Sequence, residues 1–228
     1  MAISAIIPAL NEEASIGKTV KALRLVSEIS QIIVVDDGSR DRTAAEAEQA
    51  GADYVLVLAE NRGKGGALAA GVELAHGEIF CFVDADLGAT AAEFVHLVKP
   101  VLQGEADMAV AQFPAGRRSA GFGLVKRLAS WGIYALSGYL PASPLSGQRV
   151  LQRGVWEKAV SFRDGFGVEV GLTVACVRHG YTVTEVPLSM THRETGRNWQ
   201  GFSHRGKQFI DVSRTLFRLW VNRREKPE

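Results

Sequence analysis

The sequence predicts an α/β fold, a single domain with a mostly parallel central sheet flanked by helices. The first observation is that short apolar runs alternate with stretches of helical spacing through the first hundred residues, which is typical of a parallel sheet. The second is that polar clusters directly follow these runs, as they do where ligands bind at the carboxyl ends of strands. The third is size, because 228 residues, 46% of them hydrophobic and 22% charged, suit one domain with an ordinary core.

Each element of the first half follows from local pattern. Apolar runs rich in β-forming residues predict strands at residues 2–8, 31–35, 54–58 and 79–83. Helical spacing or composition predicts helices at residues 13–27, 42–50 and 67–75, with a glycine-rich loop at 61–66. The alternation of these segments is the main support for the parallel sheet.

The second half is less regular. Strands are expected at residues 107–112 and 182–187, and helices at 125–136, 168–177 and, from its apolar spacing, 202–220. Residues 114–119 form a Gly/Arg-rich loop, 140–148 a Pro/Ser/Gly turn segment, and 190–200 a polar, irregular stretch. The patterns thus separate a regular part, residues 1–112, from a less regular part, residues 113–228, of one domain.

Charge and cysteine content exclude several classes of protein. Lys and Arg total 26 against 25 Asp and Glu, a net charge of +1, so a nucleic-acid binder that relies on bulk charge is not expected. Cys81 and Cys176 both lie in apolar contexts, which predicts buried, reduced thiols in the cytosol.

The first residues are too short an apolar stretch for a signal peptide, and no run is long enough to span a bilayer. We expect a cytoplasmic protein, the alternative being peripheral attachment to the inner membrane face.

The triplet Asp84-Ala85-Asp86 is the sharpest chemical feature. It directly follows the apolar run Ile-Phe-Cys-Phe-Val. Two carboxylates one residue apart at the end of a strand can share a hard divalent cation that also binds phosphate oxygens. The alternative is a solvated turn. A metal site is therefore predicted at this strand end.

Two other polar segments follow strands. The segment Asp36-Asp37-Gly38-Ser39 is either a plain turn or a pair of carboxylates for the hydrogen-bond donors of a nucleoside. The loop 61–66 places Arg62 and Lys64 among three glycines just before a helix, which suits an anion. The spacings GxxxxGK[ST] and GxGxxG are both absent, which argues against a P-loop and a dinucleotide site.

Four motifs together resemble the nucleotide-binding half of the family 2 glycosyltransferases, of GT-A fold. They are Ile-Ile-Pro-Ala-Leu-Asn-Glu-Glu (6–13), Val-Val-Asp-Asp-Gly-Ser-Arg-Asp-Arg-Thr (34–43), Asn-Arg-Gly-Lys-Gly-Gly-Ala (61–67) and Phe-Val-Asp-Ala-Asp-Leu (82–87). The resemblance implies that Asp84 and Asp86 hold Mg²⁺ or Mn²⁺ against the diphosphate of a nucleotide sugar. It also implies that residues 1–112 bind the donor nucleotide, which leaves residues 113–228, with the C-terminal helix, to bind an acceptor. The donor-binding residues that it implies are Pro8, Ala9, Glu12, Asp37, Lys64, Asp84 and Ala85.

The second half is similar to the glucosyl-3-phosphoglycerate synthases and their mannosyl relatives, on residues 164–172 and 190–194. This similarity implies that Glu169 contacts the donor sugar or acceptor, that His192 is a third metal ligand, and that Gly116-Arg117 belongs to the loop for the acceptor phosphate. Asp164 is a second carboxylate near Glu169, and either could act as a base on an acceptor hydroxyl. The chain is shorter than those synthases, and Glu185-Val186-Pro187-Leu188 also resembles polyprenyl-phosphate hexosyltransferases.

The C-terminal residues 202–228 carry seven Lys or Arg against three Asp or Glu. Phe217, Trp220 and Val221 are interspersed with these charges. Three interpretations remain open: docking on a membrane surface, packing on the domain with a charged outer face, and formation of a homodimer.

The sequence as a whole predicts metal-dependent transfer of a hexosyl group from a nucleotide-diphosphate sugar, UDP- or GDP-linked, to an acceptor. The acceptor is a phosphorylated small molecule such as 3-phosphoglycerate or, alternatively, a polyprenyl phosphate at the membrane. A sugar-1-phosphate nucleotidyltransferase would need a GxGxR loop after the first strand, where this chain has Ala-Leu-Asn-Glu. The remaining alternative is a non-catalytic nucleotide-sugar-binding module, against which the Asp84/Asp86 pair argues.

Overall fold

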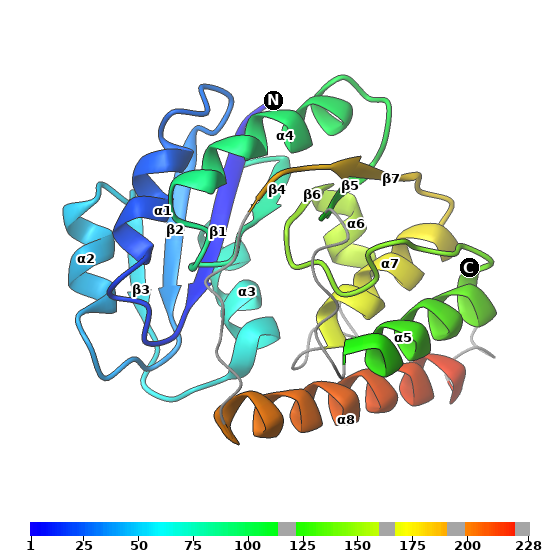
Figure 1. Cartoon of the computed structure of the whole chain (residues 1–228). Helices are drawn as coiled ribbons and strands as arrows, with labels where there is room; N and C mark the ends of the chain where they lie inside the picture. Colours follow the sequence, from blue (N-terminus) through cyan, green and yellow to red (C-terminus); the bar gives the residue numbers. More distant parts are fainter. Residues whose placement is uncertain (114–121, 160–166, 191–198, 222–228) are drawn as a thin grey trace.

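The computed structural model describes residues 1–113, 122–159, 167–190 and 199–221. Within them, one seven-stranded sheet has the order β3-β2-β1-β4-β6-β5-β7, with helices on both of its faces (Figure 1). The strands are β1 (Ile3–Ala9), β2 (Gln31–Asp36), β3 (Tyr54–Val57), β4 (Ile79–Phe82), β5 (Met108–Gln112), β6 (Arg149–Gln152) and β7 (Val183–Pro187). The predicted α/β class, with a mostly parallel central sheet flanked by helices, is confirmed.

The helices cover the sheet and extend to one side of it (Figure 1). They are α1 (Ile16–Leu23), α2 (Thr43–Gln49), α3 (Gly63–Leu74), the 3₁₀ helix η1 (Gly88–Glu93), α4 (Phe94–Leu102), α5 (Phe122–Ser137), α6 (Arg153–Lys158), α7 (Val168–Arg178) and α8 (Trp199–Val221). Among the described residues, no helix has both the length and the apolarity to cross a membrane.

The sheet is mostly parallel, and its single antiparallel strand matters for the site. Strands β1 to β4 pair in parallel, whereas β6 runs antiparallel to both β4 and β5. The register pairs Phe82, the last residue of β4, with Arg149, the first of β6. The residues before β6 therefore lie beside the residues that follow β4, at the edge where β1 and β2 also end.

Two apolar layers sandwich the sheet, and a third cluster lies apart from it. One layer packs α1 and α4 against one face, and the other packs α3, α6 and α7 against the opposite face. The third cluster joins α5, α7 and α8. Both predicted buried thiols are buried and free. Burial raises the pKa of Cys81 far above its usual range, and burial together with Asp107 raises that of Cys176 to about 12.

Some local predictions were wrong. Residues 61–66 are not a loop throughout, because α3 begins at Gly63 and takes Lys64 into its first turn. Helix α4 was missed because Pro100 interrupts the helical pattern inside it. Strand β6 was missed because it follows a turn segment and begins with an arginine that is only 1% exposed. The sheet runs through both predicted halves, and their division into donor and acceptor parts stays a prediction.

Candidate active site

The loops that follow β1 and β2 are joined by hydrogen bonds at the sheet edge. The Asn11 N–H donates to Ser39 Oγ at 2.9 Å, and the Arg40 N–H donates to Asn11 Oδ1 at 2.9 Å. Asn11 has φ 55°, a left-handed conformation that asparagine tolerates better than most residues. The Glu12 N–H donates to Thr43 Oγ1 at 2.8 Å. These bonds hold the two loops together as one rim along the carboxyl edge of the sheet. The rim includes Glu12, one of the predicted donor-binding residues.

The predicted donor residues of the first two strands lie at this rim. Pro8 and Ala9 end β1, and Asp37 directly follows β2. Asp37 is only 4% exposed, and its carboxylate accepts the Arg62 N–H at 2.7 Å. Asp37 therefore links the end of β2 to the start of α3. A contact with a nucleoside, as predicted, would be a second role for this residue.

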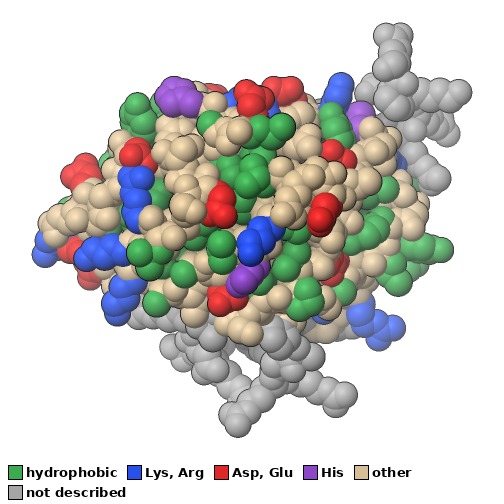
Figure 2. Space-filling view, turned by 90° about the horizontal axis from the view of Figure 1, so that it is seen from above, with side chains coloured by type: hydrophobic (Ala, Val, Ile, Leu, Met, Phe, Trp, Pro, Cys, Tyr) green, Lys and Arg blue, Asp and Glu red, His purple; other side chains and the backbone are tan. Residues whose placement is uncertain are grey.

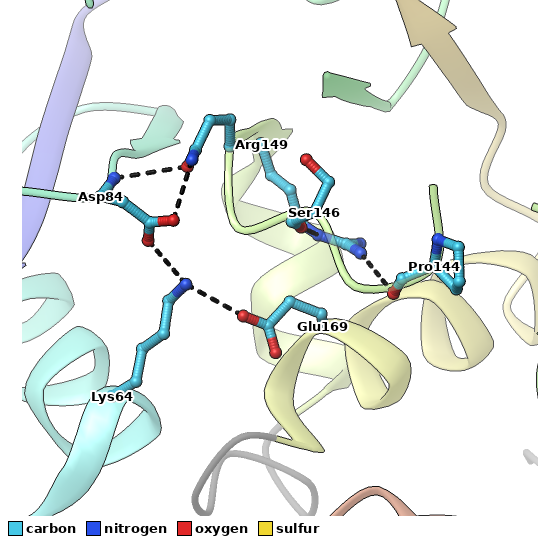
Figure 3. Close-up of polar contacts among 7 residues, drawn as sticks. Lys64, Asp84, Pro144, Ser146, Arg149 and Glu169 are labelled. Atoms are coloured by element: carbon cyan, nitrogen blue, oxygen red, sulfur yellow. Dashed lines mark hydrogen bonds and ion pairs between the residues drawn. The ribbon is translucent and has the colours of Figure 1, made fainter. Parts of the chain in front are cut away.

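Lys64 joins two carboxylates from distant parts of the chain (Figure 3). Its ammonium group lies 2.6 Å from Asp84 Oδ1 and 3.0 Å from Glu169 Oε1. The side chains of Lys64, Asp84 and Glu169 are 18%, 26% and 7% exposed. The structure thus brings together α3, the end of β4 and the first turn of α7. Glu169, which the resemblance assigns to the donor sugar or acceptor, is thus buried beside Lys64.

The charge of Lys64 is strongly favoured by its surroundings. Burial alone would lower the pKa of Lys64, but Asp84 and Glu169 outweigh this effect and raise the pKa above its ordinary value. Lys64 is therefore a permanent cation between two acids at the carboxyl edge of the sheet.

Gln148 and Gly147 are parts of the site that the sequence did not reveal. Gln148 is completely buried, and its Nε2 donates to Asp84 Oδ2 at 2.8 Å, while its Oε1 accepts the Asp84 N–H at 3.3 Å. A Cβ on Gly147 would collide with the ammonium group of Lys64 and stand 2.8 Å from both carboxylate oxygens of Asp84, so any larger residue there would force these side chains to shift. Gly147 and Gln148 lie beside Asp84 because the strand that follows them, β6, pairs antiparallel with β4. No local sequence pattern predicts that strand pairing.

Arg149 supports the same turn from inside the protein. Its guanidinium donates to the Ser146 carbonyl at 2.9 Å and to the Pro144 carbonyl at 3.4 Å (Figure 3). It also donates to Thr173 Oγ1 at 2.9 Å. Burial lowers the pKa of Arg149, against the opposing effect of Glu169 and other nearby groups. The Pro/Ser/Gly turn segment of the sequence is thus a structured support for Gly147.

The loop that carries Asp84, Ala85 and Asp86 is held from the other face of the sheet. Thr19 Oγ1 on α1 donates to the Ala85 carbonyl at 2.8 Å and accepts the Gly88 N–H at 2.9 Å. Ala85 is 5% exposed, and both aspartates are partly exposed. The backbone between the two carboxylates is therefore anchored by Thr19.

The chemistry of the donor set fits a hard divalent cation. The two aspartates supply carboxylate oxygens, the ligands that Mg²⁺ and Mn²⁺ prefer, and a diphosphate and water would supply the rest. No group of three or more His, Cys, Asp or Glu suited to a metal occurs among the described residues. The predicted third ligand His192 lies outside them, as do Arg117 and Asp164. The roles given to these three residues stay predictions.

Comparisons with known proteins bear directly on this edge of the sheet. A sequence model of the family described as Glycosyl transferase family 2 matches residues 4–141, which include the loops after β1, β2 and β4. The chain belongs to glycosyl transferase family 2. An uncharacterized family relative, protein MJ1222 of Methanocaldococcus jannaschii, is 31% identical over 95% of this chain and 90% of its own length.

Two relatives carry functional names. The glucosyl-3-phosphoglycerate synthase of Mycobacterium tuberculosis is 33% identical over 194 residues, 75% of this chain and 60% of the synthase. The undecaprenyl-phosphate 4-deoxy-4-formamido-L-arabinose transferase of Pseudomonas paraeruginosa is 39% identical over 111 residues, 45% of this chain and 33% of that protein. The chain thus spans less than two thirds of either one's length.

Solved structures extend the similarity to the whole fold. The M. tuberculosis synthase in complex with Mn²⁺, UDP and phosphoglyceric acid matches all of this chain and 80% of its own, with a TM-score of 0.78 and 29% identity. The same synthase with Mg²⁺ and UDP also gives a TM-score of 0.78, at 28% identity. The resemblance stated from the sequence motifs is confirmed.

Proposed function

We propose that this family 2 glycosyltransferase transfers a hexosyl group from a nucleotide-diphosphate sugar in a metal-dependent reaction. The observation that carries the proposal is the Asp84–Lys64–Glu169 cluster at the carboxyl edge of the sheet. Further support comes from the fold shared with a synthase that binds UDP with Mn²⁺ or Mg²⁺. UDP is therefore the first nucleotide to test, and GDP is the second.

The residues would divide the work as follows. Asp84 and Asp86 would hold Mg²⁺ or Mn²⁺, which supplies charge neutralisation for the leaving diphosphate. Lys64 adds a fixed positive charge near the same diphosphate, the kind of preorganised electrostatic stabilisation that favours departure of an anion. Gln148 holds the Asp84 carboxylate in one orientation from behind.

Glu169 faces Lys64 with Oε1, and its second oxygen would accept a hydrogen bond from a sugar or acceptor hydroxyl. The ion pair with Lys64 keeps the Glu169 carboxylate in place at the start of α7. Its predicted contact with donor sugar or acceptor is consistent with this position. A base on an acceptor hydroxyl, either Asp164 or Glu169, and the acceptor-phosphate role of Arg117 complete the proposal.

For the acceptor, we propose a phosphorylated small molecule, with 3-phosphoglycerate as the first candidate. The support is the similarity to the synthase whose structure was solved with phosphoglyceric acid. A polyprenyl phosphate is the second candidate, favoured by the 39% identity of 111 residues to the undecaprenyl-phosphate transferase. Both acceptors present a phosphate group to the enzyme, so the donor half of the site would serve either.

The test combines donor binding with turnover. Thermal unfolding is followed with UDP, GDP and ADP and their sugars, each with Mn²⁺, Mg²⁺ or EDTA, because a ligand at about 100 times its Kd stabilises by about 2.7 kcal/mol. Stabilisation by one nucleotide that EDTA abolishes selects the donor. Release of that nucleotide from its sugar form is then measured with 3-phosphoglycerate and with a polyprenyl phosphate. Binding without turnover on any acceptor would instead favour the non-catalytic module.

A further inference from the structure

Helices α5 and α8 hold a strongly uneven share of the charge. Together they contain six Lys or Arg and a single acidic residue, Asp211, a net charge of +5. The whole chain has a net charge of only +1, so the rest of the molecule carries −4. Of the cations whose side chains are described, Lys126 and Arg127 on α5 and Arg214 and Arg218 on α8 are all exposed.

The same two helices expose large apolar side chains. On α8, Phe217 is 65% and Trp220 62% exposed, and their rings lie 6.4 Å apart. On α5, Trp131 is 68% and Tyr134 54% exposed. Helical spacing of three or four residues places each pair on one face of its helix. Other exposed apolar residues of the two helices and the loop after α5 are Leu140, Phe209, Ile210 and Val221.

The outward faces of α5 and α8 belong to the same end of the molecule. Their inner faces meet in one apolar cluster with α7, and Leu216 of α8 lies so close to Gly132 of α5 that a Cβ there would collide with it. Figure 1 shows the two helices side by side along the edge of the molecule away from α4. We call the exposed surface formed by residues 126, 127, 131, 134, 140, 209, 210, 214, 217, 218, 220 and 221 the α5–α8 face.

We propose that the α5–α8 face docks on an anionic phospholipid bilayer. Aromatic and aliphatic side chains flanked by Lys and Arg are the composition of helices that lie in the headgroup region of membranes. The positive charge complements anionic headgroups, and it opposes the pairing of this face with a second copy of itself. An open hollow of about 560 Å³ on α5, lined by Lys126, Arg127, Trp131, Tyr134 and Leu140, offers a cation and aromatic edges to a lipid headgroup.

The opposite end of the molecule provides the contrast. Figure 2 shows that face, on which Asp and Glu side chains are scattered among Lys and Arg. A bilayer would therefore meet one distinct end of the protein, and binding would be oriented. The proposal does not depend on the acceptor, since a lipid-docked enzyme can use a water-soluble or a lipid phosphate.

The experiment measures binding of the full chain to vesicles by co-sedimentation. Vesicles of phosphatidylcholine alone are compared with vesicles that also contain phosphatidylglycerol, at low and high salt. We expect binding to the anionic vesicles only, weakened by salt because surface charges are screened. Binding equally to both vesicle types, or to neither, would overturn the proposal.

Variants locate the binding surface. Two double variants, Phe217→Ser/Trp220→Ser and Arg127→Glu/Arg214→Glu, should each reduce the vesicle partition coefficient at least about tenfold. The reason is that each cation at the membrane surface, and each apolar side chain that enters the bilayer, contributes substantially to the binding free energy. The matched controls are Leu25→Ser, 80% exposed, and Lys21→Glu on α1, which should leave binding unchanged. All six altered positions, controls included, are exposed, so the melting temperature should change little, and thermal unfolding serves as the folding check.

A second copy of the chain is the competing occupant. Light scattering after size-exclusion chromatography gives the oligomeric state of wild type and of Phe217→Ser/Trp220→Ser. A wild-type dimer that this variant converts to a monomer would assign the α5–α8 face to a homodimer and overturn the membrane proposal. A variant that loses vesicle binding with an unchanged oligomeric state supports it.

Discussion

Replacing Lys64 by methionine probes the central cluster, because it removes the charge and keeps most of the side chain's length. The change leaves Asp84 and Glu169 without the cation that they share at 2.6 and 3.0 Å. Glu169 is only 7% exposed, so water can compensate little. Removing one partner of a buried ion pair costs about 3–5 kcal/mol. For a chain of 228 residues this corresponds to a Tm lowered by roughly 6–20 °C.

The assay is urea and thermal unfolding of Lys64→Met, Glu169→Gln and the double variant. Because Glu169→Gln neutralises the more deeply buried of the two carboxylates that lose Lys64, we expect the double variant to recover at least about half of the stability that Lys64→Met loses. Lys18→Met, on the exposed side of α1, is the control and should stay within about 0.5 kcal/mol of wild type. A loss below about 1 kcal/mol for Lys64→Met, additive with Glu169→Gln, would refute the buried cluster.

Three further predictions concern neighbouring residues. Gly147→Ala should weaken metal-dependent nucleotide binding, measured by calorimetry, because its methyl group would stand 2.8 Å from the Asp84 oxygens. Unchanged affinity would contradict this and show that the backbone at residue 147 moves to make room for the methyl group. Gln148→Leu should cost about 1–3 kcal/mol of unfolding free energy in urea by leaving Asp84 groups unsatisfied, and no loss would contradict this. Burial and Glu185 raise the pKa of Tyr139 from 10.0 to about 12, so the folded state keeps a proton that the unfolded state has lost. Stability should therefore fall between pH 10 and 12, and less steeply in Tyr139→Phe, as urea unfolding at several pH values would show.

The parts of the site that could be predicted are those written in consecutive residues. Asp84 and Asp86 follow a buried apolar run, so both their strand end and their chemistry are visible locally. Glu12 and Asp37 follow strands in the same way, and parallel pairing brings those strand ends to one edge. Lys64 was placed near this edge by its glycine-rich context, although it lies inside the first turn of α3.

The parts that could not be predicted depend on contacts between distant segments. Gln148 is an ordinary polar residue in a turn segment until β6 pairs with β4 and places it 2.8 Å from Asp84. Arg149 would be expected on the surface, yet backbone carbonyls and Thr173 satisfy its guanidinium inside the protein. Likewise, the burial of Glu169 becomes apparent only when α7 packs beside α3 and provides Lys64 as its partner.

The most direct test of the account is whether the Asp84/Asp86 edge binds a nucleotide through a divalent cation. Calorimetric titration of UDP and GDP with Mn²⁺ or with EDTA is compared for wild type, Asp86→Asn and Glu105→Gln, the last an exposed carboxylate in the turn before β5. The account predicts that one nucleotide binds only with metal, that Asp86→Asn weakens this binding by more than about tenfold, and that Glu105→Gln matches wild type. Nucleotide affinity that survives both EDTA and Asp86→Asn would contradict it.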